Sequence, residues 1–326
     1  MLRTLFTALL VSLAPVSAAA QACGTENLIA SLTPEERARL DDLVAPHSYG
    51  EGKLFKAVKG DSEIVVVGTI HIPDPRLVPI VDSVRPYLEA ADLLILEATS
   101  ADEESIQALT VTRPEMFFIT EGPTMIDLLS TEEWALVTER LRPLGIPAFL
   151  AAKFQPWYLT MTLAIPSCAM ESLRAGEKGL DRQLEAIASE IGIPLASLES
   201  TEAVLRLFAD EPMERQLDGL RITLETQLDG DASISTLIEG YFDGRIRETW
   251  EFARIQIERS GIENGEEMFE DVDQQLLVGR NAAWEGHLPN LIRGKDAVIA
   301  VGAAHLSGES GVLRALERAG YAISRL

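Results

Sequence analysis

Short runs of consecutive apolar residues recur along the chain and are separated by longer segments with helical periodicity. Each run is four or five residues long, which is typical of strands that are buried on both faces of a sheet. The runs comprise residues 64–67, 93–96, 147–150, 195–198, 297–301 and 321–324. We predict a strand at each of these positions.

The segments between the runs have the periodicity of amphipathic helices. The predicted helices comprise residues 77–88, 131–145, 180–191 and 313–319, and residues 201–292 are nearly all helical in pattern. Strands that alternate with helices predict an α/β fold, with a mainly parallel central sheet and helices on both faces. Because no linker rich in Gly, Pro or Ser divides the chain, we expect a single domain over residues 23–326 with a helical insertion or cap at about 201–292.

Two of the predicted strands end in the same short motif. Residues 64–71 read Ile-Val-Val-Val-Gly-Thr-Ile-His, and residues 298–305 read Val-Ile-Ala-Val-Gly-Ala-Ala-His. In each copy a buried strand leads into Gly-x-x-His, a loop and then a helix. Together the two copies contain two of the four histidines of the chain. This internal similarity predicts two related halves, each with a strand and a Gly-x-x-His turn.

Polar side chains follow five of the predicted strands: His71, Glu97, Lys153 with Gln155, Glu199, and His305. The carboxyl ends of parallel strands share one edge of a sheet, where α/β proteins bind their ligands. A single histidine after a strand is usually a turn or core residue, but two histidines and two glutamates that converge on one edge favour a functional site.

Arg280 lies on the apolar stripe of a predicted helix, between Leu276 and Trp284. A guanidinium on that face needs a carboxylate or an anionic ligand, because an unpaired buried charge is costly. A purely structural Arg–Glu pair satisfies the same requirement. Asp74 is either a ligand or a turn residue before a proline, whereas His47 and His287 read as a loop and a helix-surface residue.

Composition and charge narrow the class of partner. The chain has 28 Lys and Arg against 51 Asp and Glu, a net charge of −23, which argues against a nucleic-acid partner. A hydrophobic fraction of 47% is enough to build a sizeable core.

The first residues read as a secretory signal peptide. Arg3 precedes an apolar stretch over residues 5–16 and a small-residue tract over 17–20, so we expect residues 1–22 to be removed from an exported protein that is periplasmic or secreted. This stretch is shorter than the ~20 residues that a membrane span needs, and no later segment is long and apolar enough. In an oxidising compartment Cys23 and Cys168 can form a disulfide, the alternative being two buried free thiols.

Taken in order, several short motifs resemble the TraB/GumN family. They are Gly68-Thr69-Ile70-His71, Glu97, Pro156-Trp157, Gly179-Leu180-Asp181, Leu198-Glu199-Ser200, Arg280-Asn281, Val301-Gly302-Ala303-Ala304-His305 and Gly320-Tyr321. The resemblance extends from about residue 50 to residue 326, and it departs from the family pattern at Ser200, where Thr is commoner. The family shares its fold with the Tiki metalloproteases, and its relatives include erythromycin-esterase-like and haem-binding ChaN-like proteins. The early Cys23 and the segment around Cys168 look like a subgroup feature, which supports the disulfide.

The resemblance implies a metal-dependent hydrolase centred on the two Gly-x-x-His motifs, Glu97 and Arg280. Independently, two imidazoles and a carboxylate make an open site for Zn²⁺, Mn²⁺ or Co²⁺, with His71, His305 and Glu97 as ligands. Glu199 is then the expected general base, and Arg280 stabilises an oxyanion or orients Glu97. The expected substrate is a peptide or a small molecule, most simply a peptide bond.

Other enzyme classes lack their motifs here: there is no His-Glu-x-x-His, Gly-x-Ser-x-Gly or Gly-x-Gly-x-x-Gly signature. Two alternatives stay open. One is a protein of the same fold that binds haem or a peptide without turnover, with a histidine as axial ligand or clamp. The other is a buried hydrogen-bond network without a ligand.

Overall fold

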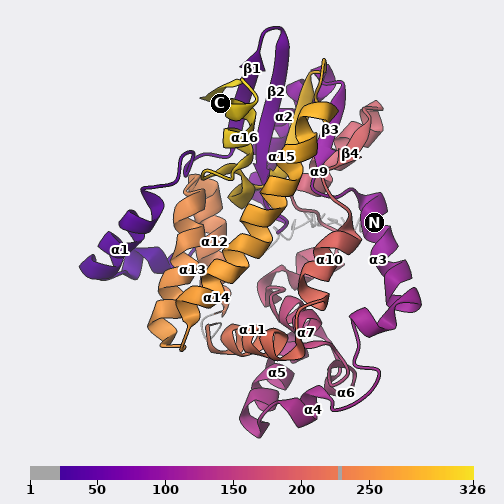
Figure 1. Cartoon of the computed structure of the whole chain (residues 1–326), viewed down its shortest axis with the longest axis vertical. Helices are drawn as coiled ribbons and strands as arrows, with labels where there is room; N and C mark the ends of the chain where they lie inside the picture. The colour runs from indigo at the N-terminus through magenta and orange to yellow at the C-terminus, as the bar shows by residue number, and fades with distance from the viewer. Residues whose placement is uncertain (1–22, 227–229) are drawn as a thin grey trace, which may run out of the picture.

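A six-stranded sheet, with helices packed on its faces, lies at one end of the molecule (Figure 1). Most of the other helices form the opposite end. The computed structural model describes residues 23–226 and 230–326, so the expected signal peptide lies outside the described residues. The strands are ordered β4-β3-β5-β2-β1-β6. Their bounds are Leu195–Ser197 for β4, Leu93–Leu96 for β3, Ala297–Gly302 for β5, Ser62–Thr69 for β2, Leu54–Lys59 for β1 and Ala322–Arg325 for β6.

The sheet is mainly parallel, as predicted. β5 pairs in parallel with β2 on one side and with β3 on the other, and β4 pairs in parallel with β3. β1 pairs antiparallel with both β2 and β6. The two strands that lead into Gly-x-x-His are therefore neighbours, and Thr69 of the first is in register with Gly302 of the second.

Helices cover both faces of the sheet. On one face, α2 (Val78–Ala90) and α9 (Leu180–Ile191) pack against alternate residues of the central strands. On the other face, α15 (Gly279–Leu291) and α16 (Val312–Arg318) pack against the remaining residues. Because both faces are covered, the central strands are apolar throughout, which explains their uninterrupted apolar runs.

The predicted strand at residues 147–150 is wrong. This segment forms the short helix α6 (Ala148–Ala151), with Pro147 as its N-cap and Phe149 79% exposed. A short apolar run has no periodicity that separates strand from helix, and this one lacks β-branched residues. Lys153 and Gln155 therefore lie in the helical part of the molecule and not at the edge of the sheet. There the side-chain amide of Gln155 donates to the backbone carbonyls of Glu115 and Phe118.

Two insertions build the helical part. Between β3 and α9 the chain forms α3 (Ser100–Thr112), α4 (Met125–Leu128), α5 (Thr131–Leu144), α6, α7 (Pro156–Leu163) and α8 (Met170–Arg174). Between β4 and β5 it forms α10 (Thr201–Ala209), α11 (Met213–Thr226), α12 (Gly230–Asp243), α13 (Ile246–Ser260), α14 (Gly265–Asp273) and a π-helix over Gln274–Val278. α7 and α11 share an apolar core, so both insertions belong to one helical part. Among residues 23–226 and 230–326, every helix is too short or too polar to span a bilayer.

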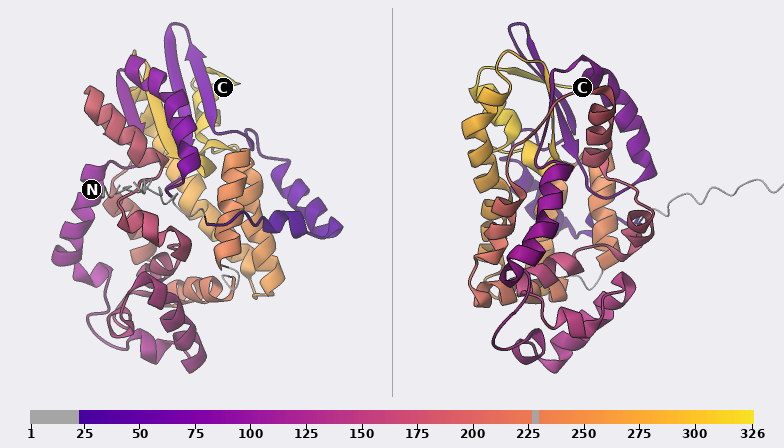
Figure 2. Two further views of the ribbon diagram at one scale, coloured as in Figure 1. Left: turned by 180° about the vertical axis from the view of Figure 1, so that it is seen from behind. Right: turned by 90° about the vertical axis from the view of Figure 1, so that its right-hand side faces the viewer.

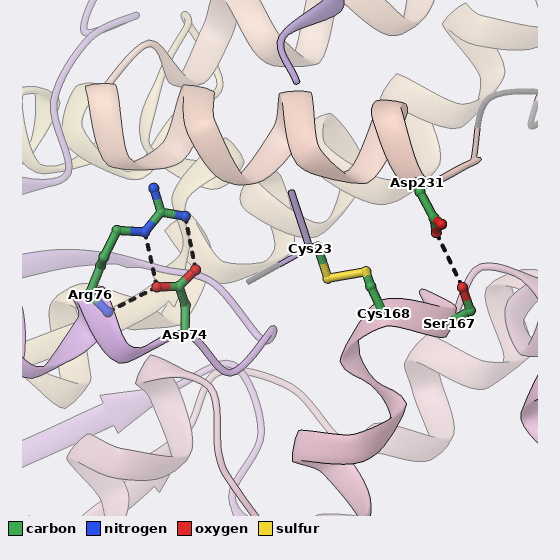
Figure 3. Close-up of a disulfide and its surroundings, with 6 residues drawn as sticks. All are labelled: Cys23, Asp74, Arg76, Ser167, Cys168 and Asp231. Atoms are coloured by element: carbon green, nitrogen blue, oxygen red, sulfur yellow. Dashed lines mark hydrogen bonds and ion pairs between the residues drawn. A yellow bond between two sulfur atoms is a disulfide. The ribbon is translucent and has the colours of Figure 1, made fainter. Parts of the chain in front are cut away.

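The expected disulfide between Cys23 and Cys168 is present (Figure 3). It ties the first described residue to a 3₁₀ turn, Ser167–Ala169, across 145 residues of sequence. Cys23 belongs to the same apolar cluster as Ile238 and Tyr241 of α12. The disulfide therefore fastens the N-terminal segment beside a helix that contacts the sheet.

Candidate active site

Four of the sequence-predicted residues lie at the carboxyl edge of the parallel strands. Glu97 follows β3, and Glu199 follows β4 by two residues. His71 lies in the loop after β2, and His305 lies in the 3₁₀ turn Ala303–Leu306 that follows β5. Parallel topology brings these four positions to one edge because each strand ends there.

Arg280 lies at the centre of this cluster, where its guanidinium reaches three of the four side chains. Its Nη2 donates to Glu97 Oε2 at 2.5 Å and also to Glu199. Its Nε donates to Glu199 Oε1 at 3.0 Å, and its Nη1 lies 3.1 Å from His305 Nε2. The side chain of Arg280 is only 13% exposed. Arg280 was expected to pair with a carboxylate, and it pairs with two, Glu97 and Glu199.

His305 is buried and is held in one tautomer. The amide nitrogen of Asn281 donates to the His305 carbonyl at 3.3 Å, so its oxygen faces the ring, 2.7 Å from Nδ1. Nδ1 therefore carries the proton, and the Nε2 lone pair accepts from Arg280. Burial lowers the pKa of His305 to about 4. The negative charge of Glu97 opposes this shift, and the positive charge of Arg280 adds to it. His305 is neutral at physiological pH.

Glu97 stays ionised although it is mostly buried. Burial opposes its charge. His305, which is protonated at the low pH where Glu97 titrates, together with Arg280 and the backbone N–H of Gly302, outweighs burial and holds the pKa of Glu97 at about 2. The Gly302 N–H donates to Glu97 Oε1 at 2.6 Å. A Cβ atom at residue 302 would lie 3.0 Å from the same oxygen, so the glycine of the second motif lets the carboxylate approach the backbone.

Asp181 is a site residue that belongs to the Gly179-Leu180-Asp181 motif but was given no role from the sequence. It lies in the first turn of α9, and its Oδ1 is 3.1 Å from His71 Nδ1. This carboxylate raises the pKa of His71, whose side chain is 69% exposed. The neighbouring Gly179 approaches the first turn so closely that a Cβ there would lie 2.4 Å from the His71 carbonyl oxygen. The signal in the sequence was an acidic residue on the buried face of an amphipathic helix.

A cavity of about 170 Å³ opens among these residues, lined by His71, Glu97, Asp181, Glu199 and Arg280. Thr69 and Thr201 also line it, and their hydroxyl oxygens are buried with no hydrogen-bond partner among the described residues. Buried polar atoms usually have a partner, so these hydroxyls are suited to a polar ligand or to water in the cavity.

A further contact fixes the first Gly-x-x-His turn. The hydroxyl of Tyr241, on α12, donates to the carbonyl oxygen of Gly68 at 2.9 Å in a buried position. The other candidates have structural roles: Asp74 caps the 3₁₀ turn Pro75–Leu77 and bonds Arg76 (Figure 3), and His287 lies on the exposed side of α15. His47 lies in a loop, with its Nε2 3.6 Å from Glu251.

The expected metal ligands, two imidazoles and a carboxylate, are of the types that bind divalent cations, but the three side chains do not lie close enough together to coordinate one ion. Glu97 Oε1 lies 3.8 Å from His305 Nε2, and His71 lines the same cavity as Glu97. Within the described ranges, no three His, Cys, Asp or Glu side chains are grouped closely enough to hold a metal ion. To complete the set, His71 has to approach the other two ligands, and Arg280 Nη1 has to release His305 Nε2.

One comparison with known proteins identifies the family of the chain. The family model of the TraB/PrgY/gumN family matches residues 53–325, which is most of the chain. The chain therefore belongs to the TraB/PrgY/gumN family, as its motifs indicated. A search of curated proteins finds no match.

Proposed function

We propose that this chain is an exported, metal-dependent hydrolase that cleaves peptide bonds, with His71, His305 and Glu97 as the ligands of the cation. When bound, a divalent cation supplies Lewis-acid polarisation of a carbonyl group and activation of water. Family membership and the convergence of these residues on one cavity support the proposal.

The observation that carries the proposal is the way both histidines are held. His305 Nδ1 is hydrogen-bonded to Asn281 Oδ1 at 2.7 Å, and His71 Nδ1 lies at ion-pair distance, 3.1 Å, from Asp181 Oδ1. Metal-binding histidines almost always have such a partner, because it fixes the ring and leaves the other nitrogen as the donor atom. In both residues Nε2 is the nitrogen that remains.

The carboxylates and Arg280 take different parts in this proposal. Glu199 accepts from Arg280 and from Trp284 Nε1 at 3.2 Å, so both of its oxygens are bonded to side chains of α15. We therefore assign Glu199 the task of holding Arg280, in place of the general base expected from the sequence. Arg280 keeps Glu97 ionised and presents N–H groups to negative charge that develops on a substrate oxygen.

Ligand binding without turnover is the second candidate, and the hydrogen bond from Arg280 to His305 Nε2 favours it, because that lone pair is in use. A haem ligand is disfavoured, since the 170 Å³ cavity beside the histidines is far smaller than a macrocycle requires.

Replacing Asp181 with Asn tests the proposal with little change in side-chain volume. We expect a loss of about 10–100-fold in metal affinity or in hydrolysis of a peptide library, because His71 loses the carboxylate that orients it. The matched control is Asp74→Asn, a carboxylate that is also buried but bonds Arg76 outside the cavity, and it should retain metal and activity. Full metal binding and full hydrolysis in Asp181→Asn would contradict the proposed role of the His71–Asp181 pair.

A further inference from the structure

A second, larger cavity lies in the helical part and has no role in the chemistry proposed above. Its volume is about 710 Å³, within the range of pockets that bind small ligands or peptide segments. Its lining residues belong to α7, α10, α11, α13, α14 and the π-helix. These helices lie in the helical end of the molecule, away from the sheet (Figures 1 and 2). Four aromatic side chains line it: Trp157, Phe208, Trp250 and Phe269. We call this cavity the apolar groove.

Two elements connect the apolar groove with the candidate active site. Along α10, Thr201 and Val204 line the catalytic cavity, and Phe208, one turn further, lines the groove. On the opposite wall, Leu276 of the π-helix lines the groove, and its carbonyl accepts from Arg280 Nη1 at 3.3 Å. Single π-helical turns are frequent at functional sites. A ligand in the groove is therefore one helical turn away from the site along both walls.

The groove is built to be open and adaptable. Gly219 lies in the interior of α11 and lines the groove, and a Cβ atom placed there would meet nothing within 4 Å. Glycine in a helix interior is less stable than alanine, so this residue gives up stability where it leaves space. Met161 and Met268 add flexible apolar side chains, which adjust to ligands of varied shape.

The charges at the groove disfavour an anionic occupant. Arg215 is the cation among the described lining residues, and it is paired with Asp271 at 3.0 Å. Glu211 also lines the groove, so its charged lining is net acidic. An acyl chain with a carboxylate or phosphate head group would be repelled there, whereas an uncharged apolar segment of a polypeptide would not.

We propose that the apolar groove binds an apolar segment of the polypeptide substrate, at a distance from the bond that is cleaved. This inference rests on the proposed function for its chemistry, but binding in the groove is measurable without turnover. Because α10 and the π-helix next to Arg280 connect the groove with the candidate active site, the groove extends the substrate site. It selects peptides by their apolar side chains.

Gly219→Leu tests this proposal, because it fills the groove at a position where the added side chain meets open space. Gly286→Leu is the matched control, since Gly286 is also an open position in a helix, on the exposed side of α15 and outside the groove. The probes are a capped peptide of alternating Leu and Ala, a capped peptide of alternating Ser and Ala, and decanoate. The measurement is equilibrium binding by intrinsic fluorescence, because Trp157 and Trp250 line the groove.

We expect the Leu/Ala peptide to bind the wild type and Gly286→Leu equally, and Gly219→Leu about tenfold more weakly or worse. The Ser/Ala peptide and decanoate should bind weakly to all three proteins. Equal affinity of the Leu/Ala peptide for Gly219→Leu and the wild type would overturn the proposal, as would a preference for decanoate. Because nothing is hydrolysed in this assay, its failure leaves the metal site to be tested separately.

Discussion

Replacing Arg280 with alanine should lower the free energy of unfolding by about 3 kcal/mol and abolish hydrolysis. The side chains of Arg280, Glu97 and Glu199 are 13%, 18% and 13% exposed, so the variant leaves two poorly solvated carboxylates without a countercharge. Breaking a buried ion pair by removing one partner typically costs about 3–5 kcal/mol, and the remaining solvent exposure places this cluster at the lower end. Urea unfolding followed by circular dichroism measures the change.

Arg318→Ala is the matched control for that measurement. Arg318 pairs with Glu285 of α15 at 2.7 Å, but the two side chains are 42% and 39% exposed, so the expected cost is below about 1 kcal/mol. Arg280→Lys keeps the charge and loses the planar fork, so it should recover part of the stability without restoring activity. If Arg280→Ala is as stable as Arg318→Ala, Arg280 does not hold the two carboxylates together.

Removing the disulfide should have an effect of similar size on stability. Cys23 and Cys168 are 145 residues apart, for which the chain-entropy model gives about 5 kcal/mol as an upper value. We expect the Cys23→Ala/Cys168→Ala variant to lose about 2–5 kcal/mol of unfolding free energy. Cys23 belongs to the same apolar cluster as Tyr241, which anchors the Gly68 turn, so the candidate site should loosen as well.

The wild type provides the control for the disulfide. Its stability should fall to that of the double-alanine variant when a reductant is added, whereas the variant should not respond to reductant. A wild type that unfolds at the same urea concentration with and without reductant would show that the disulfide does not stabilise the fold.

The central strands were predictable because burial on both faces leaves a clear pattern. β2, β3 and β5 are uninterrupted apolar runs, and helical segments separate them in sequence. β1 was not predicted, since it is a strand near the sheet edge in which only Phe55 and Ala57 are buried. The helix at residues 148–151 was mistaken for a strand because a four-residue apolar run has no period to read.

The site was predictable to the extent that topology determines it. His71, Glu97, Glu199 and His305 each follow a parallel strand, and their meeting at one edge needs no knowledge of side-chain packing. Asp181, Asn281 and Tyr241 come from helices, and which helix face meets the site depends on tertiary packing. Asp181 had a signal, because it and Glu185 form an acidic pair four residues apart on the buried face of α9.

Elemental analysis of the purified protein tests whether His71 and His305 hold a catalytic divalent cation. The comparison is between wild type, the His71→Ala/His305→Ala variant and His287→Ala, whose histidine lies on the exposed side of α15. We predict one Zn²⁺, Mn²⁺ or Co²⁺ per chain and peptide hydrolysis in the wild type and in His287→Ala, with both lost in the double variant. Equal metal content and equal hydrolysis in the wild type and the double variant would show that His71 and His305 hold no catalytic cation.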